Sequence, residues 1–199
     1  MSQLLSLSRT YPSRYGAPAI AWIDSTIFRI HYFTYCLECT FCHDWCCQFG
    51  VDVDLVHYRV IQRHSDALEA YTGIARGDWF TEEYEEDPGV PGGGSMRTAA
   101  RRGACVFLNR SGRGCLLHAF AIERGIDYRE LKSLVDCLFP LSFYDDVLCP
   151  ADEVEEGSLV CVGTGPTLYR GLRDTLEYYF GKGFVRELDA MERAGGSNR

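Results

Sequence analysis

The alternation of apolar and polar residues predicts short strands and helices along most of the chain. Branched and aromatic side chains dominate residues 26–35, which favours a strand there. Apolar residues recur at helical spacing over residues 55–71, and Asp54 stands where a capping side chain would begin that helix. Pro166 suits the first turn of a C-terminal helix, and Gly181 would interrupt that helix.

The middle of the chain predicts one mobile loop and several shorter elements. Acidic residues fill positions 82–87, and prolines and glycines dominate positions 88–95, a composition that suits no regular element. Apolar residues on both sides of a glycine-rich turn predict a hairpin over residues 103–118, and two short helices are expected after it. Further strands are expected at residues 141–144 and 159–162. Together these segments predict an α+β fold of short strands and helices.

Length and composition predict a single globular domain with two loose ends. The 199 residues include 46 % hydrophobic and 24 % charged side chains, which argues against disorder. We expect a loosely ordered N-terminal arm at residues 1–20, one domain at residues 21–194 and a flexible tail at residues 195–199. The sequence shows neither a signal peptide nor an apolar run long enough to span a membrane, so we expect a cytoplasmic protein.

Ten cysteines change this ordinary picture, because clustered thiols in a reducing compartment are typical of metal or redox sites. Five of them lie within twelve residues, in the pattern C-x2-C-x2-C-x3-C-C. Two-residue gaps let a tight loop direct successive sulfurs at one point, as a metal ion or cluster requires. The first four follow the spacing of a bacterial ferredoxin run, but a fifth cysteine replaces its proline and no second run follows. This first cysteine group consists of Cys36, Cys39, Cys42, Cys46 and Cys47.

A second group of candidate ligands lies further along the chain. Cys115 and His118 have a spacing that is typical of zinc sites, and an imidazole nitrogen suits zinc or iron. Cys105 lies in the predicted hairpin, and Cys137 follows the predicted short helices. The hairpin thiols have no other evident partner, so we expect this group to converge with the first.

Together the two groups predict a metal centre around which the domain is organised. We expect this centre to hold zinc or iron, with an iron–sulfur cluster as one form of the iron centre. Side chains of adjacent residues diverge, so Cys46 or Cys47 would serve a second ion or remain a reactive thiol. We expect Cys149 and Cys161 to be buried or unligated thiols. The candidate metal ligands are Cys36, Cys39, Cys42, Cys46, Cys47, Cys105, Cys115, His118 and Cys137.

Three further blocks follow the first cysteine group in order: Cys-Val-Phe-Leu at residues 105–108, Gly-Cys-Leu-Leu-His at 114–118 and Cys-Leu-Phe-Pro-Leu at 137–141. This series resembles the YkgJ-like cysteine-cluster family, which is described as a zinc- or iron-chelating domain. The resemblance covers residues 36–141. The commoner family run is C-x2-C-x2-C-C, so the insertion in this chain leaves the role of Cys42 open. The cysteines that the resemblance implies as family-matching are Cys36, Cys39, Cys46, Cys47, Cys105, Cys115 and Cys137.

Metal binding is therefore the predicted function, and two other classes of function remain open. The centre could serve a redox or group-transfer enzyme, since a related cysteine cluster occurs in flagellin lysine methylases. It could instead stabilise a scaffold that binds a protein partner. Five arginines between positions 97 and 113 form a local basic stretch, but the net charge of −8 favours a solvated surface there. We therefore expect neither nucleic acid nor a membrane as a partner.

Overall fold

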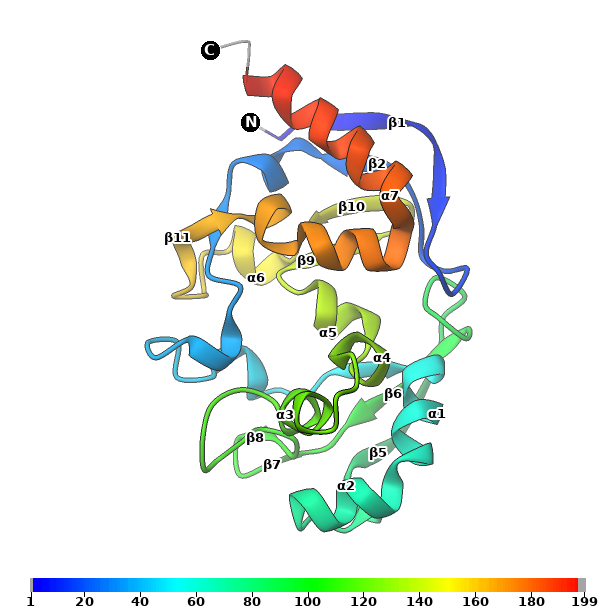
Figure 1. The fold of residues 1–199 in the computed structure, drawn as a ribbon, viewed down its shortest axis with the longest axis vertical. Coiled ribbons are helices and arrows are strands. Elements are labelled where there is room, and N and C mark those ends of the chain that lie inside the picture. Colours follow the sequence, from blue (N-terminus) through cyan, green and yellow to red (C-terminus); the bar gives the residue numbers. More distant parts are fainter. Residues whose placement is uncertain (1, 197–199) are drawn as a thin grey trace. The chain divides into compact units, whose positions relative to one another are not determined.

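The computed structural model describes residues 2–196 and shows the mixture of helices and strands that defines an α+β protein (Figure 1). Contacts between residues divide the chain into two units. The first unit combines the N-terminal segment up to Thr34 with the segment from Leu138 onward, and the second unit is Tyr35–Cys137. All nine candidate ligands therefore belong to the second unit. Among the described residues, no helix is both long and apolar enough to cross a bilayer.

A four-stranded sheet organises the first unit. Strand β2 pairs antiparallel with β1 and parallel with β10, and β9 and β10 form an antiparallel hairpin. Ile20 and Ile23 of β2 and Leu148 of β10 are fully buried, which places the apolar core of this unit against the central strands. Within residues 2–196 the strands run in the order β1 (Leu4–Pro12), β2 (Ala19–Asp24), β10 (Val147–Pro150) and β9 (Leu141–Tyr144). The predicted strand at residues 141–144 is thus confirmed.

The predicted loose arm at residues 1–20 is wrong, because most of that segment belongs to the sheet. Leu7 and Tyr11 of β1 are each only 7 % exposed. Glu187 accepts hydrogen bonds from the Ser8 hydroxyl at 2.8 Å and the Tyr11 hydroxyl at 2.7 Å. This segment is ordered by its pairing with β2 and by its hydrogen bonds to Glu187, a residue far along the chain. Neither interaction is visible in the local composition of the segment.

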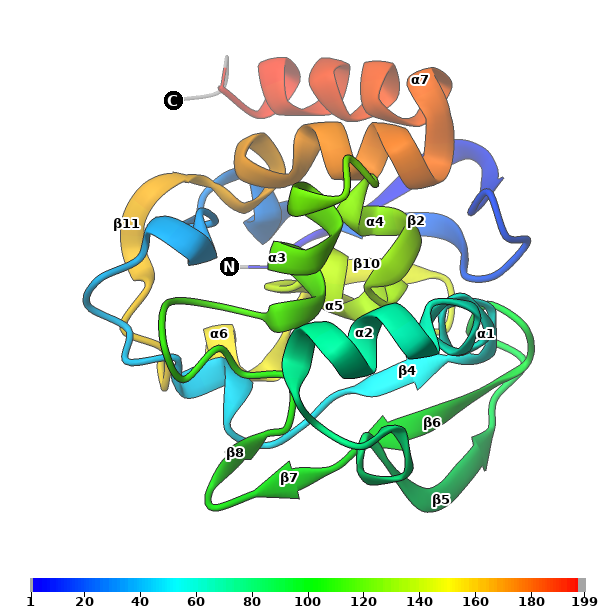
Figure 2. The same cartoon turned by 60° about the horizontal axis from the view of Figure 1, so that its bottom comes forward.

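Helix α7 (Leu168–Gly196) ends the first unit and consists of two helical segments. Gly181 has a φ of 83° and interrupts the helix at the predicted residue. The two segments fold back on each other (Figure 2), and the Tyr169 hydroxyl donates to the Val185 carbonyl at 2.9 Å. Of the predicted tail, Gly195 and Gly196 belong to α7, and residues 197–199 lie outside the described residues.

The predicted strand at residues 26–35 is wrong over most of its length. The Asp24 carboxylate accepts from the backbone N–H of Thr26 at 2.8 Å and starts a 3-10 turn, which competes with extended backbone. Only two residues further on does a short strand form, and it pairs antiparallel with the segment before α7. These remaining elements of the first unit are η1 (Ser25–Phe28), β3 (His31–Tyr32), α6 (Asp152–Glu155) and β11 (Val162–Thr167).

A second, three-stranded sheet lies in the second unit. Within the described residues its order is β4 (Asp52–Asp54), β6 (Gly94–Thr98) and β5 (Phe80–Glu86), all antiparallel. The mobile loop predicted over residues 82–95 is therefore wrong at both ends, and only residues 87–93 form the turn. The glutamates of β5 are exposed on an edge strand, where charged side chains are tolerated and discourage pairing with other chains.

The helices of the second unit begin largely where capping residues predict. Asp54 accepts from the backbone N–H of His57 at 3.0 Å and starts α1, as predicted, and the helical segment then breaks at His64. Asp127 accepts from Arg129 N–H and starts α4 in the same way. The helices are α1 (Leu55–Arg63), α2 (Ser65–Thr72), η4 (Arg76–Asp78), α3 (Leu116–Glu123), α4 (Tyr128–Leu131) and α5 (Leu134–Leu138), the last of which continues into the first unit.

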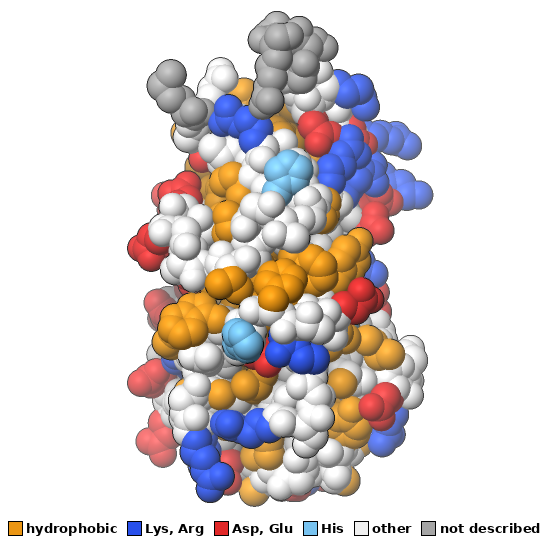
Figure 3. Space-filling view, turned by 90° about the vertical axis from the view of Figure 1, so that its left-hand side faces the viewer, with side chains coloured by type: hydrophobic (Ala, Val, Ile, Leu, Met, Phe, Trp, Pro, Cys, Tyr) orange, Lys and Arg blue, Asp and Glu red, His pale blue; other side chains and the backbone are white. Residues whose placement is uncertain are grey.

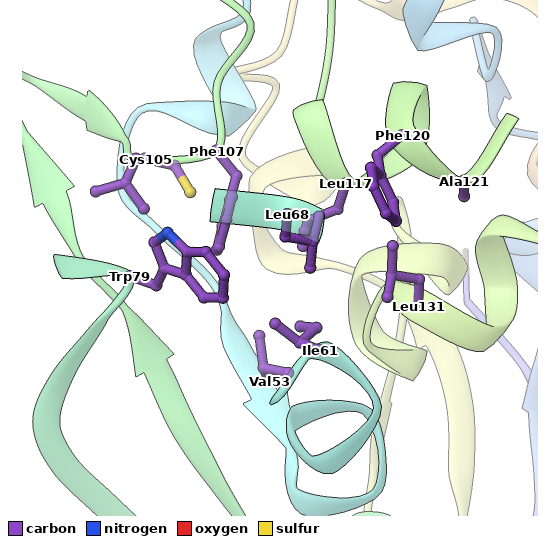
Figure 4. Packing of buried hydrophobic residues seen from close by; sticks show 11 residues of the cluster. Val53, Ile61, Leu68, Trp79, Cys105, Phe107, Leu117, Phe120, Ala121 and Leu131 are labelled. Atoms are coloured by element: carbon purple, nitrogen blue, oxygen red, sulfur yellow. The ribbon is translucent and has the colours of Figure 1, made fainter. Parts of the chain in front are cut away.

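The core of the second unit packs helices α1 to α4 against the side chains of its strands (Figure 4). Trp79 and Phe107 lie at its centre with ring centroids 5.7 Å apart, and Phe120 is 1 % exposed. The hairpin predicted over residues 103–118 is much shorter than expected. Its regular part is β7 (Ala100–Arg101) with β8 (Ala104–Cys105), followed by an isolated bridge between Leu108 and Cys115.

Candidate metal centre

The first cysteine group lies on a loop that two short 3-10 turns shape: η2 (Cys36–Glu38) and η3 (Trp45–Cys47). Between these turns His43 and Asp44 both have positive φ values, 51° and 55°, which reverse the direction of the backbone. The two residues that make this reversal lie between Cys42 and Cys46. The C-x2-C-x2-C-x3-C-C pattern therefore forms one compact loop, as its spacing predicts.

Cys39 and Cys42 are the pair of this loop that best suits a metal ion. Their sulfur atoms lie within 4.8 Å of each other, and Cys39 is 1 % exposed. Burial and the hydrogen bond with Cys39 raise the pKa of the Cys42 thiol, and a metal ion that binds this sulfur would displace its proton. These two sulfurs can contact one ion, and thiolate sulfur is a preferred donor for zinc and iron.

Arg113 ties this pair to the segment before α3. Its guanidinium donates to the Cys42 sulfur at 3.2 Å and forms an ion pair with Asp44 at 2.9 Å. The neighbouring Gly114 has a φ of 72°, and a Cβ there would lie 2.6 Å from a methyl carbon of Leu37. Only glycine lets the two loops approach so closely. Sequence analysis treated Arg113 as part of a solvated basic stretch and missed this role.

Cys46 and Cys47 form a second pair, with their sulfur atoms 4.0 Å apart on the turn η3. Both residues are half-buried. The hydrogen bond with Cys46, together with burial, raises the pKa of the Cys47 thiol strongly. The hydrogen bond between the two sulfurs therefore favours the protonated form of Cys47.

The loop also exposes aromatic side chains beside its thiols. Tyr35 and Phe49 are each 58 % exposed, Trp45 is 46 % exposed and Phe41 is 40 % exposed. The rings of Trp45 and Phe49 meet edge to face with centroids 5.8 Å apart. Figure 3 shows hydrophobic side chains exposed on the face of the molecule on which this loop lies. Exposed aromatic residues of this density mark a surface that can receive a ligand or partner.

The second group of candidates lies on three elements: β8, the start of α3 and α5. Cys105 in β8 is 8 % exposed, belongs to the apolar core and donates weakly to the Thr98 hydroxyl at 3.5 Å (Figure 4). Cys115 immediately precedes α3, where burial raises the pKa of its thiol to about 12. Cys137 in α5 is 5 % exposed and donates to the Lys132 carbonyl at 3.7 Å.

His118 is the single nitrogen donor among the nine candidates. Its ring stacks on Tyr128 with centroids 4.2 Å apart. Burial, with a smaller contribution from Lys132, lowers the pKa of His118 to about 4. The ring is therefore neutral at pH 7, which is the form that coordinates a metal ion.

Lys132 and Asp136 are residues of this region that sequence analysis missed. Their side chains form an ion pair of 3.2 Å, and the Lys132 side chain is 12 % exposed. Burial alone would lower the pKa of the Lys132 ammonium, but Asp136 and the sulfur groups of Cys115 and Cys137 outweigh burial and raise it well above its usual value. The i, i+4 spacing of Lys132 and Asp136 was a visible signal.

Lys132 also shows how far the two cysteine groups converge. Cys36 of the first group and Cys115 and Cys137 of the second all interact electrostatically with its ammonium. Among the described residues of the second unit, however, no three of the nine candidate ligand atoms lie within 4.8 Å of one another. The two groups share one electrostatic environment, and direct convergence of their sulfurs stays a prediction.

A buried contact between His57 and Asp54 anchors the segment that carries Lys132 and Cys137. His57 is fully buried, and its Nδ1 lies 2.7 Å from the Asp54 carboxylate. The Asp54 carboxylate also accepts from the backbone N–H of Leu134, at 3.1 Å, where α5 begins. This contact fixes the position of the helix that holds Cys137 relative to α1.

Comparisons with known proteins return no match: no family model, no curated protein and no solved structure corresponds to this chain. The resemblance to the YkgJ-like family therefore stays a hypothesis that rests on the four cysteine blocks.

Proposed function

We propose that the second unit binds a metal ion through its cysteines, with Cys39 and Cys42 as the first two ligands. The observation that carries this proposal is the approach of their sulfurs to within 4.8 Å in a loop whose spacing suits a metal. Further ligands come from the remaining candidates of both groups. Thiols crowded into one loop become mutually repulsive thiolates when they lose their protons and need a cation between them, so metal binding and the final shape of the loop are coupled.

We propose zinc or iron as the metal, including an iron–sulfur cluster. Thiolates and a neutral imidazole are the donors that both metals accept. Lys132 supports a thiolate-rich centre, because several thiolates around one divalent ion carry net negative charge that a nearby ammonium offsets. The cysteine blocks support membership of the YkgJ-like family, and the abundance of thiols supports residence in the reducing cytoplasm.

A second candidate function is a metal-stabilised surface that binds a protein partner. The exposed aromatic residues of the cysteine loop favour it, because aromatic side chains dominate the energetics of protein interfaces. In this case the metal shapes the loop and the aromatic residues make the contact. An enzyme that uses the centre for redox or group transfer would instead need a thiol or coordination position that stays open.

Elemental analysis of anaerobically purified protein tests the metal proposal. We expect a stoichiometric amount of zinc or iron in the unmodified protein and in the Cys149→Ser control. Cys149 lies in the first unit and donates only to the Ser142 carbonyl at 3.8 Å. Cys39→Ser and Cys42→Ser should each lose most of the metal. Retention of metal in both variants would show that these two cysteines are not ligands.

A further inference from the structure

We propose that Cys46 and Cys47 form a vicinal dithiol site, separate from the metal centre, that takes one soft atom able to bond two sulfurs, such as trivalent arsenic. The nine candidate ligands exceed the four that a tetrahedral ion needs, so some of the thiols have another role. The adjacent pair is the one whose geometry suits a ligand of this kind.

The two sulfurs already face each other. They lie 4.0 Å apart on a single 3-10 turn, so one atom can bond both with small side-chain rotations. Within the described part of the second unit, neither sulfur belongs to a group of three ligand atoms that lie within 4.8 Å of one another. A pair without a third neighbouring ligand suits a centre that needs two sulfurs better than a tetrahedral ion.

The surroundings of the pair admit a small ligand. Both cysteines are half-buried, and the exposed aromatic residues Trp45 and Phe49 lie in the same short segment of the loop. Their rings meet edge to face, and an apolar surface of this kind suits an aryl group that is attached to the bound atom.

The reaction with an aryl arsenic(III) oxide balances without an oxidant or reductant. Two arsenic–sulfur bonds form, and the arsenic–oxygen bonds break. The oxide oxygen leaves as water together with the two thiol protons, and arsenic stays trivalent throughout. The second bond is intramolecular, so a chelated adduct resists a monothiol that would strip a singly bonded arsenical.

Phenylarsine oxide is the probe, added to the protein as purified and followed by native mass spectrometry. We expect one adduct per chain that survives excess 2-mercaptoethanol and is removed by a dithiol such as dimercaptopropanol. Peptide mapping should place it on residues 45–48. Cys46→Ser and Cys47→Ser should each lose the resistant adduct, whereas Cys149→Ser should keep it, with circular dichroism confirming that each variant is folded.

Two results would overturn the proposal. The first is a resistant adduct that persists in Cys46→Ser or Cys47→Ser, which would locate the dithiol elsewhere. The second is metal-loaded protein that forms no adduct until a chelator removes the metal, which would make both sulfurs ligands of that metal. Peptide mapping distinguishes an adduct on residues 45–48 from one on Cys39 and Cys42, so this test and the metal proposal fail separately.

Discussion

Asp54 is the residue at which one substitution should disturb the second unit most. Its carboxylate accepts from the backbone N–H of His57 at 3.0 Å, from His57 Nδ1 at 2.7 Å and from Leu134 N–H at 3.1 Å. The Nε2 of His57 lies 3.1 Å from the Arg129 carbonyl, which can only accept. Both ring nitrogens of the buried His57 therefore face acceptors, and the Asp54 carboxylate holds the ring through Nδ1.

Asp54→Ala should lower the free energy of unfolding by about 3–5 kcal/mol, because it leaves buried N–H groups of His57 and Leu134 without their acceptor, each at a cost of about 1–3 kcal/mol. The same substitution also removes the cap of α1. That cap is worth about 0.5–2 kcal/mol on its own, and its loss is included in the predicted decrease. Proteins of this size are stable by about 5–15 kcal/mol, so the variant should lose a large share of its stability.

Urea denaturation followed by circular dichroism measures this effect, with two matched variants. Asp54→Asn keeps an acceptor for the α1 cap and should be less destabilised than Asp54→Ala. The double variant Asp54→Ala/His57→Leu removes the acceptor together with the ring that it holds, so it should be more stable than the sum of the single effects predicts. A loss below about 1 kcal/mol in Asp54→Ala, or strict additivity in the cycle, would refute this role of the Asp54–His57 contact.

Three further predictions concern other contacts of the chain. Arg113→Met removes a charged hydrogen bond to Cys42, worth about 1.5–3 kcal/mol, so a chelator should release the metal about tenfold faster, and Arg113→Lys should recover part of this loss. Equal release rates would contradict the role of Arg113. Chelation of the metal should lower the melting temperature, and an unchanged melt of verified metal-free protein would separate metal binding from folding. The hydrogen bond from Arg173 lowers the pKa of Asp189 to about 2, so the stability that Asp189 adds is present above about pH 4 and lost as pH falls towards 2. Asp189→Asn should therefore melt earlier than the unmodified protein at pH 7, and this difference should shrink between pH 4 and pH 2; a constant difference would contradict the assignment.

Sequence patterns predicted the features that depend on neighbouring residues. Asp54 and Asp127 cap helices because a carboxylate reaches N–H groups two or three positions ahead. Gly181 breaks the last helix because its backbone adopts a positive φ. The cysteine spacing likewise predicted a compact loop, since two-residue gaps constrain the backbone locally.

Features that depend on distant residues were not predicted. Strand β1 is ordered by β2 and by Glu187, which lies more than 170 positions away. His57 is not spaced from other candidate residues as a metal ligand would be. Its structural role becomes visible only in the fold, where Asp54 and Arg129 lie on either side of its ring. The role of Lys132 was not predicted for the same reason, because it depends on cysteine sulfurs that come from several elements.

The central claim is that cysteine sulfurs of the second unit hold a metal. X-ray absorption at the metal edge tests it most directly, because the spectrum identifies the metal and counts its sulfur ligands. We expect zinc or iron with predominantly sulfur ligands in anaerobically purified protein, and we expect that signal to disappear in the Cys39→Ser/Cys42→Ser double variant but persist in Cys149→Ser. Protein that contains no metal, or a double variant with an unchanged sulfur shell, would contradict the account.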